Sequence, residues 1–290
     1  MAEASPRRAA VLGAPIAHSL SPLLHTTAYD VLGLDGWSYA AIRVDTDGLA
    51  GFLAGLDEAW VGLSLTMPLK RVVLPLLDEV AELAGRVGAV NTVTFEAGTR
   101  RTRGDNTDVA GMVAALAQAG VPQVGQAVVL GAGATACSAV AALAVLGVPA
   151  VTVLARRPQA STEVRAVAER FGVDVEVLGW GRAPQLLGAP LLVATTPAGA
   201  TDGLLEWLPE RPGVLLEVVY HPWPTPLAAA WAARGGLVVG GLELLVQQAV
   251  RQVRLFVAAA GAHVAPVGDE ELVAQLRRAG QQQLRVRAEG

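Results

Sequence analysis

Cysteine, lysine and charge of either sign are scarce in this chain of 290 residues. The single cysteine, Cys137, excludes a disulfide framework and any cysteine-rich metal site. Charged residues make up 17% of the chain, below the ~25% of ordinary globular proteins, and the hydrophobic fraction reaches 52%. The net charge of −4 provides no basic surface, so we expect no nucleic-acid partner. This composition excludes a disordered chain and predicts about two domains.

Only one of the 22 basic residues is a lysine, Lys70. Arginine keeps its proton at neutral pH, whereas lysine can act as a proton donor and acceptor. Lys70 follows the apolar run Val61–Leu65, and Pro68 suits the first turn of a helix. The positive end of a helix dipole disfavours an ammonium group, so we interpret Lys70 as a candidate proton donor. The alternative is an ordinary surface lysine.

Two segments suggest export or membrane insertion, and neither interpretation is favoured. Arg7 and Arg8 resemble a twin-arginine signal, but the apolar run after them contains Gly13 and Pro15. Residues 127–155 carry no charge and are long enough to span a bilayer, yet glycines and a proline divide them into strand, helix and strand. We therefore expect a cytoplasmic protein with no membrane partner.

Short apolar runs alternate with helical patterns, which predicts an α/β fold with mainly parallel sheets. Residues 1–108, completed by helices in 242–290, are expected to form an N-terminal α/β domain. Residues 109–241 are expected to form a second α/β domain. Among the expected elements are a strand at Ala89–Phe95 and helices at Pro75–Arg86 and Asp269–Arg278.

A glycine-rich turn with the pattern G-x-G-x-x-A follows the apolar run Val128–Leu130. Gly131 allows a tight turn, Gly133 allows a pyrophosphate to approach the backbone, and Ala136 allows close helix packing. Because this turn connects a predicted strand to a predicted helix, dinucleotide binding is favoured over a plain turn.

The next predicted strand ends with two arginines, Arg156 and Arg157. An NAD site usually carries an acidic residue there to bind the ribose hydroxyl. Two guanidinium groups suit a 2′-phosphate instead, so the pattern favours NADP over NAD. A solvated basic turn is the alternative.

Polar residues follow other predicted strands as well. Asp108 precedes a helical pattern, where Thr107 or Asp108 fits an N-cap, or where Asp108 serves as a carboxylate beside Lys70. Ser21 fits an N-cap, whereas Ser19 lacks that explanation and is free to bind a polar ligand. Tyr220 ends a strand in a proline-rich turn and is a further candidate. The four histidines lack metal-ligand spacing, so no metal site is predicted.

Taken together, these segments resemble the shikimate dehydrogenase family from Val11 to about Gln252. The motifs follow the family's order: G-x-P-I-x-H-S-x-S-P (Gly13–Pro22), T-x-P-x-K (Thr66–Lys70), G-A-V-N-T (Gly88–Thr92), D-N-T-D (Asp105–Asp108), the glycine-rich turn, Y-x-P-x-x-T-P (Tyr220–Pro226) and G-L-x-x-L-x-x-Q (Gly241–Gln248). Each motif alone is weak evidence, but seven in this order are specific.

The resemblance implies reversible NADPH-dependent reduction of 3-dehydroshikimate to shikimate, in the biosynthesis of aromatic amino acids through chorismate. It implies that residues 1–108, with helices in 242–290, form the domain for substrate binding and catalysis, and that residues 109–241 form a doubly wound, Rossmann-type domain for NADP. It also implies that Lys70 and Asp108 are the catalytic pair. The implied contacts with the substrate carboxylate are Ser19, Ser21 and Tyr220, and those with its hydroxyls are Thr66, Asn91 and Gln248. The implied NADP contacts are Gly131, Ala132, Gly133, Ala134, Thr135, Ala136 and Arg156, with Val218 and Gly241 near the nicotinamide. We expect a monomer or a homodimer.

The chain departs from the family pattern at four places, none of which removes a proposed catalytic group. Ser64 and Ala155 each replace a usual Asn, Glu217 replaces an Asp, and Ala194–Gly199 replace N-A-T-x-x-G. Two other interpretations stay open: a quinate/shikimate dehydrogenase with relaxed substrate or cofactor use, and a non-catalytic NADP-sensing protein. The chain does not fit a folate-type methylene dehydrogenase. The Tyr-x-x-x-Lys motif of that family is absent, because Thr66 stands four residues before the only lysine, Lys70.

Overall fold

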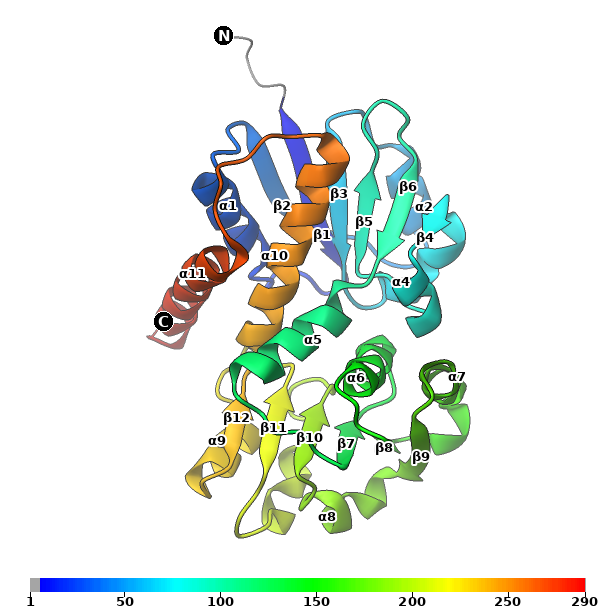
Figure 1. The fold of residues 1–290 in the computed structure, drawn as a ribbon, viewed down its shortest axis with the longest axis vertical. Helices are drawn as coiled ribbons and strands as arrows, with labels where there is room; N and C mark the ends of the chain where they lie inside the picture. The colour runs from blue at the N-terminus through cyan, green and yellow to red at the C-terminus, as the bar shows by residue number, and fades with distance from the viewer. Residues whose placement is uncertain (1–5, 290) are drawn as a thin grey trace. The chain divides into compact units, whose positions relative to one another are not determined.

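A computed structural model describes residues 6–289, which divide into two compact units. The first unit joins the residues up to Thr107 to those from Leu245 onward, and the second is Asp108–Leu244 (Figure 1). Both boundaries fall at or inside helices, α5 (Thr107–Gln118) and α10 (Gly241–Ala260), rather than in the turns before them.

The first unit is built on a mixed sheet of six strands. The order across the sheet is β2 (Trp37–Arg43), β1 (Arg7–Gly13), β3 (Trp60–Leu65), β5 (Thr92–Phe95), β6 (Thr102–Asp105) and β4 (Glu79–Val80). Strand β1 is parallel to both of its neighbours, whereas β5 runs antiparallel to β3 and β6.

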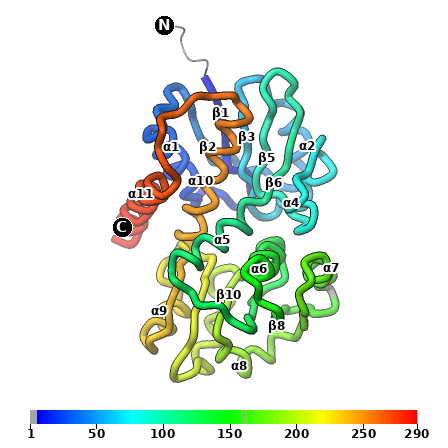
Figure 2. Tube along the Cα trace, in the orientation of Figure 1, coloured from blue at the N-terminus to red at the C-terminus, as the bar shows by residue number. Residues whose placement is uncertain are grey.

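Helices from both ends of the chain cover this sheet. The C-terminal α11 packs against α1, and Figure 2 shows these distant segments side by side. Helix α10 crosses a face of the sheet at Gly62, where an added Cβ would lie 2.1 Å from the Phe256 ring. Only glycine therefore allows this approach. The helices of the unit are α1 (Ser21–Leu32), α2 (Leu49–Ala54), α3 (Leu69–Val72), α4 (Glu82–Val87), α10 and α11 (Asp269–Glu289), with a 3₁₀ turn η1 (Leu74–Leu76).

The predicted helix Pro75–Arg86 is wrong, because the segment contains the end of η1, then β4 and most of α4. The Asp78 carboxylate accepts hydrogen bonds from the Thr102 amide and hydroxyl, both at 2.8 Å, and this draws the segment onto the edge of the sheet. The strand expected at Ala89–Phe95 begins only at Thr92, and the helix expected at Asp269–Arg278 continues to Glu289.

The second unit contains a parallel sheet with the doubly wound order predicted for a dinucleotide-binding domain. Its strands at Gln126–Leu130, Leu191–Ala194 and Val214–Glu217 are almost continuously apolar, as expected for parallel strands covered on both faces. The order is β12 (Leu237–Val239), β11 (Val214–Glu217), β10 (Leu191–Ala194), β7 (Gln126–Leu130), β8 (Ala150–Ala155) and β9 (Asp174–Gly179), with every neighbouring pair parallel.

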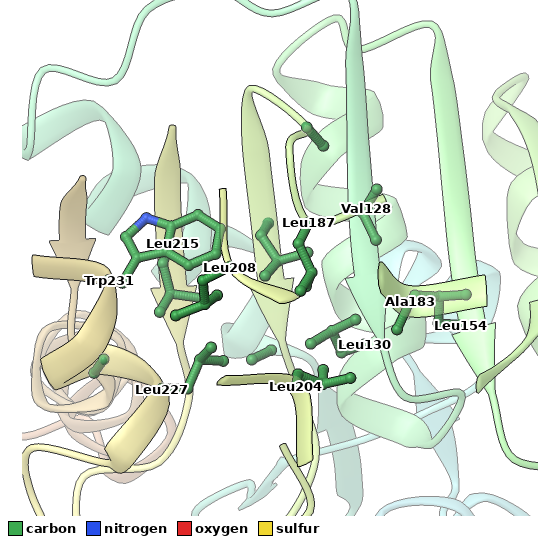
Figure 3. Packing of buried hydrophobic residues seen from close by; sticks show 14 residues of the cluster. Val128, Leu130, Leu154, Ala183, Leu187, Leu204, Leu208, Leu215, Leu227 and Trp231 are labelled. Carbon is green, nitrogen blue, oxygen red and sulfur yellow. The ribbon is translucent and has the colours of Figure 1, made fainter. Parts of the chain in front are cut away.

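Apolar side chains from the strands, from α8 (Ala183–Leu186) and from α9 (Pro226–Ala233) form one core of this unit (Figure 3). Trp231 is fully buried there, and its indole nitrogen donates a 3.0 Å hydrogen bond to the Gly213 carbonyl. The helices are α5, α6 (Ala134–Val145), α7 (Thr162–Phe171), α8 (Ala183–Leu186) and α9 (Pro226–Ala233), with 3₁₀ turns η2 (Pro158–Ala160), η3 (Trp180–Arg182) and η4 (Asp202–Trp207).

The uncharged stretch 127–155 folds into the last part of β7, then α6 and β8, as predicted. Within residues 6–289, no helix is long and apolar enough to cross a membrane.

Candidate active site

Two loops of the first unit meet where β1 and β3 end. The Thr66 amide donates to the Leu12 carbonyl at 2.9 Å, and the Ala14 amide donates to the Met67 carbonyl at 3.0 Å. An added Cβ on Gly13 would lie 2.4 Å from the Thr66 Cγ2 atom, so glycine is required at this crossing. The contact brings the segment that carries Ser19 next to the segment that carries Thr66 and Lys70.

Lys70 lies in α3, a helix of only four residues that begins at Leu69. So short a helix aligns few peptide dipoles, and the expected effect of a helix terminus on the ammonium group therefore loses its basis. The Lys70 backbone is well anchored, because its carbonyl accepts a 2.7 Å hydrogen bond from the Val90 amide. Lys70 thus stands beside the segment that leads into Asn91.

The structure changes the interpretation of Ser21 as a helix cap. Ser21 is the first residue of α1 and is buried, the N-cap is Leu20, and no side chain caps the helix. The predicted N-cap role of Ser21 is therefore wrong. The Ser19 hydroxyl accepts a 3.2 Å hydrogen bond from the Ser21 amide, and the preceding His18 carbonyl accepts one from Arg287 at 2.8 Å.

Asn91 is buried, and its side chain is hydrogen-bonded to Thr107, the first residue of α5. The Asn91 Oδ1 atom accepts hydrogen bonds from the Thr107 amide and the Thr92 hydroxyl, both at 2.8 Å. A side chain from another part of the chain thus satisfies the first amide of the helix, and Thr107 and Asp108 are the first two residues of α5 rather than the residue before it. Asp108, buried and second in α5, follows this anchored residue.

Gln248 joins the same cluster from α10. The Thr107 hydroxyl donates to Gln248 Oε1 at 3.5 Å, and Gln248 Nε2 donates to the Leu245 carbonyl at 3.0 Å. The structure therefore brings together two of the predicted hydroxyl-binding residues, Asn91 and Gln248, through Thr107.

Several buried polar residues of this cluster escaped prediction. Gln252 lies one turn after Gln248 in α10 and reaches Ser64 and Thr92, and Tyr39 reaches Ser64. The available signals were the four-residue spacing of the two glutamines and the replacement of the usual Asn by Ser64.

The glycine-rich turn of the second unit has the expected strand–turn–helix form. Gly131 adopts φ +107°, and its Cβ would lie 2.7 Å from the Thr195 hydroxyl. Helix α6 begins at Ala134, and its N-cap is Gly133, where an added Cβ would meet no atom within 4 Å. Ala136 is fully buried, in keeping with close packing of the helix.

This turn fits the phosphate groups of a dinucleotide. Among the described residues, no side chain caps α6 and no atom lies within 4 Å of an added Gly133 Cβ, so the start of this helix has room for an anion. The Thr196 hydroxyl, beside Gly131, is buried and lacks a hydrogen-bond partner within residues 6–289. Arg156 is exposed after β8 and is available to a phosphate, whereas Ala155 is buried.

The segment after β11 contains Val218 and Tyr220. An added Cβ on Gly241 would lie 2.3 Å from the Val218 carbonyl oxygen, so the two residues expected near the nicotinamide are in contact. Glu217 is 2% exposed, and burial raises the pKa of its carboxyl to about 7. The carboxyl accepts hydrogen bonds from the Val219 amide and the Thr225 hydroxyl, each at 3.4 Å, and so connects the two ends of this segment.

Comparisons with known proteins match shikimate dehydrogenases, and the matches to whole proteins extend over both units. Residues 11–93 match the model of the shikimate dehydrogenase substrate binding domain. A shikimate dehydrogenase (NADP(+)) of Thermus thermophilus is 39% identical over 249 residues, covering 86% of this chain and 92% of that protein. The Mycobacterium tuberculosis shikimate dehydrogenase structure is 38% identical, with a TM-score of 0.82, covering 94% of this chain and all of that one. A structure of shikimate 5-dehydrogenase from Thermus thermophilus, in complex with NADP(H) and shikimate, is 36% identical, with a TM-score of 0.77 and coverage of 94% and 99%.

Proposed function

This chain belongs to the shikimate dehydrogenase family, and we propose that it catalyses the reversible NADPH-dependent reduction of 3-dehydroshikimate to shikimate in aromatic amino acid biosynthesis. The observation from the structure that supports this most directly is the buried cluster of Asn91, Thr107 and Gln248 beside the segment of Lys70. These are neutral hydrogen-bonding groups, as recognition of a polyhydroxylated ring requires.

The substrate contacts are proposed residue by residue. Thr66, Asn91 and Gln248 bind the ring hydroxyls, and Ser19, Ser21 and Tyr220 hold the carboxylate. An analogue that lacks one of these groups would leave a buried polar side chain unpaired, which is costly and so gives specificity.

Lys70 and Asp108 form the proposed catalytic pair. When bound, NADPH supplies the hydride that reduces the ring ketone. The Lys70 ammonium donates its proton to the oxygen that becomes the hydroxyl, and in the reverse direction its neutral amine accepts that proton. The Asp108 carboxylate orients the Lys70 amine.

The proposed cofactor contacts lie in the second unit. The turn from Gly131 to Ala136 binds the pyrophosphate, and Arg156 binds the 2′-phosphate. Val218 and Gly241 line the nicotinamide end. The open space at Gly133 and the unpartnered hydroxyl of Thr196 support this assignment.

The deciding experiment follows nicotinamide absorbance with purified protein, shikimate and either NADP⁺ or NAD⁺. We expect faster turnover with NADP⁺. Replacement of Lys70 by Ala is expected to lower kcat on the order of 10²–10⁴-fold. Lys70→Arg should be similarly impaired, because arginine keeps the charge but cannot transfer the proton.

Each contrary result has a defined meaning. Preference for NAD⁺ would contradict the role of Arg156, and full activity in Lys70→Ala would contradict the catalytic pair. NADPH binding without turnover would favour the NADP-sensing interpretation. Turnover of quinate in place of shikimate would favour the quinate enzyme, although the relatives described above are named shikimate dehydrogenases. The cytoplasmic location and the oligomeric state stay predictions.

A further inference from the structure

We propose that Gln252 is a positioning residue that orients the Asn91 and Gln248 side chains for the ring hydroxyls of the substrate. The inference rests on the proposed function and extends it to a residue that contacts no substrate. Gln252 is 1% exposed, lies one turn after Gln248 in α10, and reaches across to β3 and β5.

The hydrogen bonds of Gln252 fix the direction of its own amide. Its Oε1 atom accepts from the Ser64 hydroxyl at 2.8 Å. Its Nε2 atom donates to the Thr92 hydroxyl at 3.0 Å and to the Asn91 carbonyl at 3.3 Å. A rotated amide would put two donors against the Ser64 hydroxyl and an acceptor against a carbonyl, so one orientation is favoured.

The direction of donation along these hydrogen bonds is set by Tyr39. The Tyr39 hydroxyl donates its only hydrogen to the Ser64 oxygen at 2.6 Å, which leaves the Ser64 hydrogen for Gln252 Oε1. Burial raises the pKa of Tyr39, so its hydroxyl keeps this hydrogen. The His25 ring stacks on Tyr39 at 3.9 Å, and its pKa is lowered to about 4 by burial, so the group facing Tyr39 is neutral at pH 7.

Donation in the same direction continues from Gln252 to the residues proposed to bind the ring hydroxyls. Thr92 receives a hydrogen from Gln252 and gives its own to Asn91 Oδ1 at 2.8 Å. Asn91 Oδ1 also accepts the Thr107 amide, so protein donors occupy it. Asn91 Nδ2 donates to the Thr107 hydroxyl at 2.9 Å, and the single hydrogen of that hydroxyl faces two acceptors, Asn91 Oδ1 at 3.2 Å and Gln248 Oε1 at 3.5 Å.

One consequence concerns specificity. Because the Thr107 amide and the Thr92 hydroxyl occupy Asn91 Oδ1, the proposed contact of Asn91 with a ring hydroxyl is one in which Asn91 Nδ2 donates. The substrate hydroxyl that it binds must therefore accept this hydrogen bond and keep its own hydrogen for another acceptor. Loss of Gln252 would free the Thr92 hydroxyl to rotate and weaken this fixed pattern of donors and acceptors.

Steady-state kinetics of the full chain test the proposal. Gln252→Met removes the amide at similar volume, Thr92→Val removes the next hydroxyl, and Tyr39→Phe removes the first donor. Gln252→Met and Thr92→Val should raise KM for shikimate about tenfold, the effect of a lost buried hydrogen bond, with a smaller rise for Tyr39→Phe. KM for NADP⁺ should stay within about twofold in all three.

Thr94→Val is the matched control, because Thr94 is buried two residues along β5 and its hydroxyl bonds only weakly, at 3.5 Å, to the Arg103 carbonyl. It should leave KM for shikimate unchanged. A second measurement compares the binding of shikimate with that of analogues lacking one ring hydroxyl. For the analogue that lacks the hydroxyl bound by Asn91, Gln252→Met should have no effect.

An equal rise of both KM values in Gln252→Met, an equal effect of Thr94→Val and Thr92→Val, or an undiminished effect on every analogue would overturn the proposal. If Gln252→Met fails to fold, KM for shikimate and for NADP⁺ in Thr92→Val and Tyr39→Phe tests the proposal by the same criteria. Absence of shikimate turnover in the unaltered protein would overturn the proposed function itself. Turnover with unchanged KM in the three variants would overturn this inference alone.

Discussion

Two buried side chains, His25 and Glu217, give stability opposite dependences on pH. Burial lowers the pKa of His25 from 6.5 to about 4, so the unfolded chain binds a proton first as the pH falls. The stability that His25 contributes is complete above pH 6.5 and is lost as the pH falls toward 4. Burial raises the pKa of Glu217 from 4.5 to about 7, so its contribution is complete below pH 4.5 and is lost as the pH rises toward 7.

Glu217→Gln should therefore gain stability relative to the unaltered protein as the pH rises from 4.5 to 8. A neutral amide has no proton to release, and the difference in unfolding free energy should reach about 3 kcal/mol. Urea unfolding at pH 4.5 and at pH 8 measures it. Glu210→Gln, a change at an exposed carboxylate, is the control. Identical pH profiles for Glu217→Gln and the unaltered protein would contradict the assignment.

At the scale of elements, the turn between β7 and α6 uses its two glycines for different reasons. Gly131 needs its positive φ and its close approach to Thr195, whereas Gly133 has open space where a side chain would stand. Glycine at position 131 is required by the fold, whereas glycine at position 133 is required by the proposed ligand.

Alanine substitutions should separate these two requirements. Gly131→Ala is expected to destabilise the protein by about 1–3 kcal/mol, because of backbone strain and the contact with Thr195. Gly133→Ala should leave the melting temperature nearly unchanged and yet weaken NADPH binding about tenfold or more, because the methyl group occupies the phosphate approach. Thermal unfolding and NADPH titration of both variants measure this. Unchanged NADPH affinity in Gly133→Ala would remove the support for this turn as the pyrophosphate site.

The C-terminal helix α11 contacts the loop that leads into Ser19, one of the proposed substrate contacts. Arg287 donates a 2.8 Å hydrogen bond to the carbonyl of His18, the residue before Ser19. Arg287→Ala should raise KM for shikimate about threefold to tenfold, since a charge-assisted hydrogen bond that holds this loop is lost. Arg285→Ala, at an exposed position of the same helix, should have no effect in the same kinetic assay. An equal effect of the two substitutions would indicate a general effect of charge.

For the molecule as a whole, the order of the chain and the division into units do not coincide. The second unit is one continuous segment, whereas the first needs residues from both sides of it. The contact of Phe256 with Gly62 is one that the N-terminal segment cannot make alone.

A fragment of residues 108–244 should therefore fold cooperatively and bind NADPH, because it contains the whole parallel sheet and the core around Trp231. A fragment ending at residue 107 should remain unfolded, since it lacks α10 and α11. Circular dichroism with thermal unfolding, and NADPH titration of the first fragment, test both statements. A folded N-terminal fragment would show that the C-terminal helices are dispensable.

The sequence allows prediction of features that depend on neighbouring residues. The turn at Gly131, the three elements in the stretch 127–155 and the parallel second sheet all follow from local patterns. The pairing of Asp78 with Thr102 and the bond between Ser64 and Gln252 join residues 24 and 188 positions apart. No periodicity records such contacts, so β4 and the buried polar cluster appear only in the folded chain.

The return of the C-terminal segment to the first unit also affects synthesis on the ribosome. The residues up to Thr107 emerge first, but their partner helix begins to leave the exit tunnel only after all of Asp108–Leu244 has been made. The N-terminal sheet therefore cannot complete its packing while the middle segment is translated and folds. During that time, the surface that Phe256 later covers stays exposed. In this protein, the part of the chain that is made first is the last to be completed.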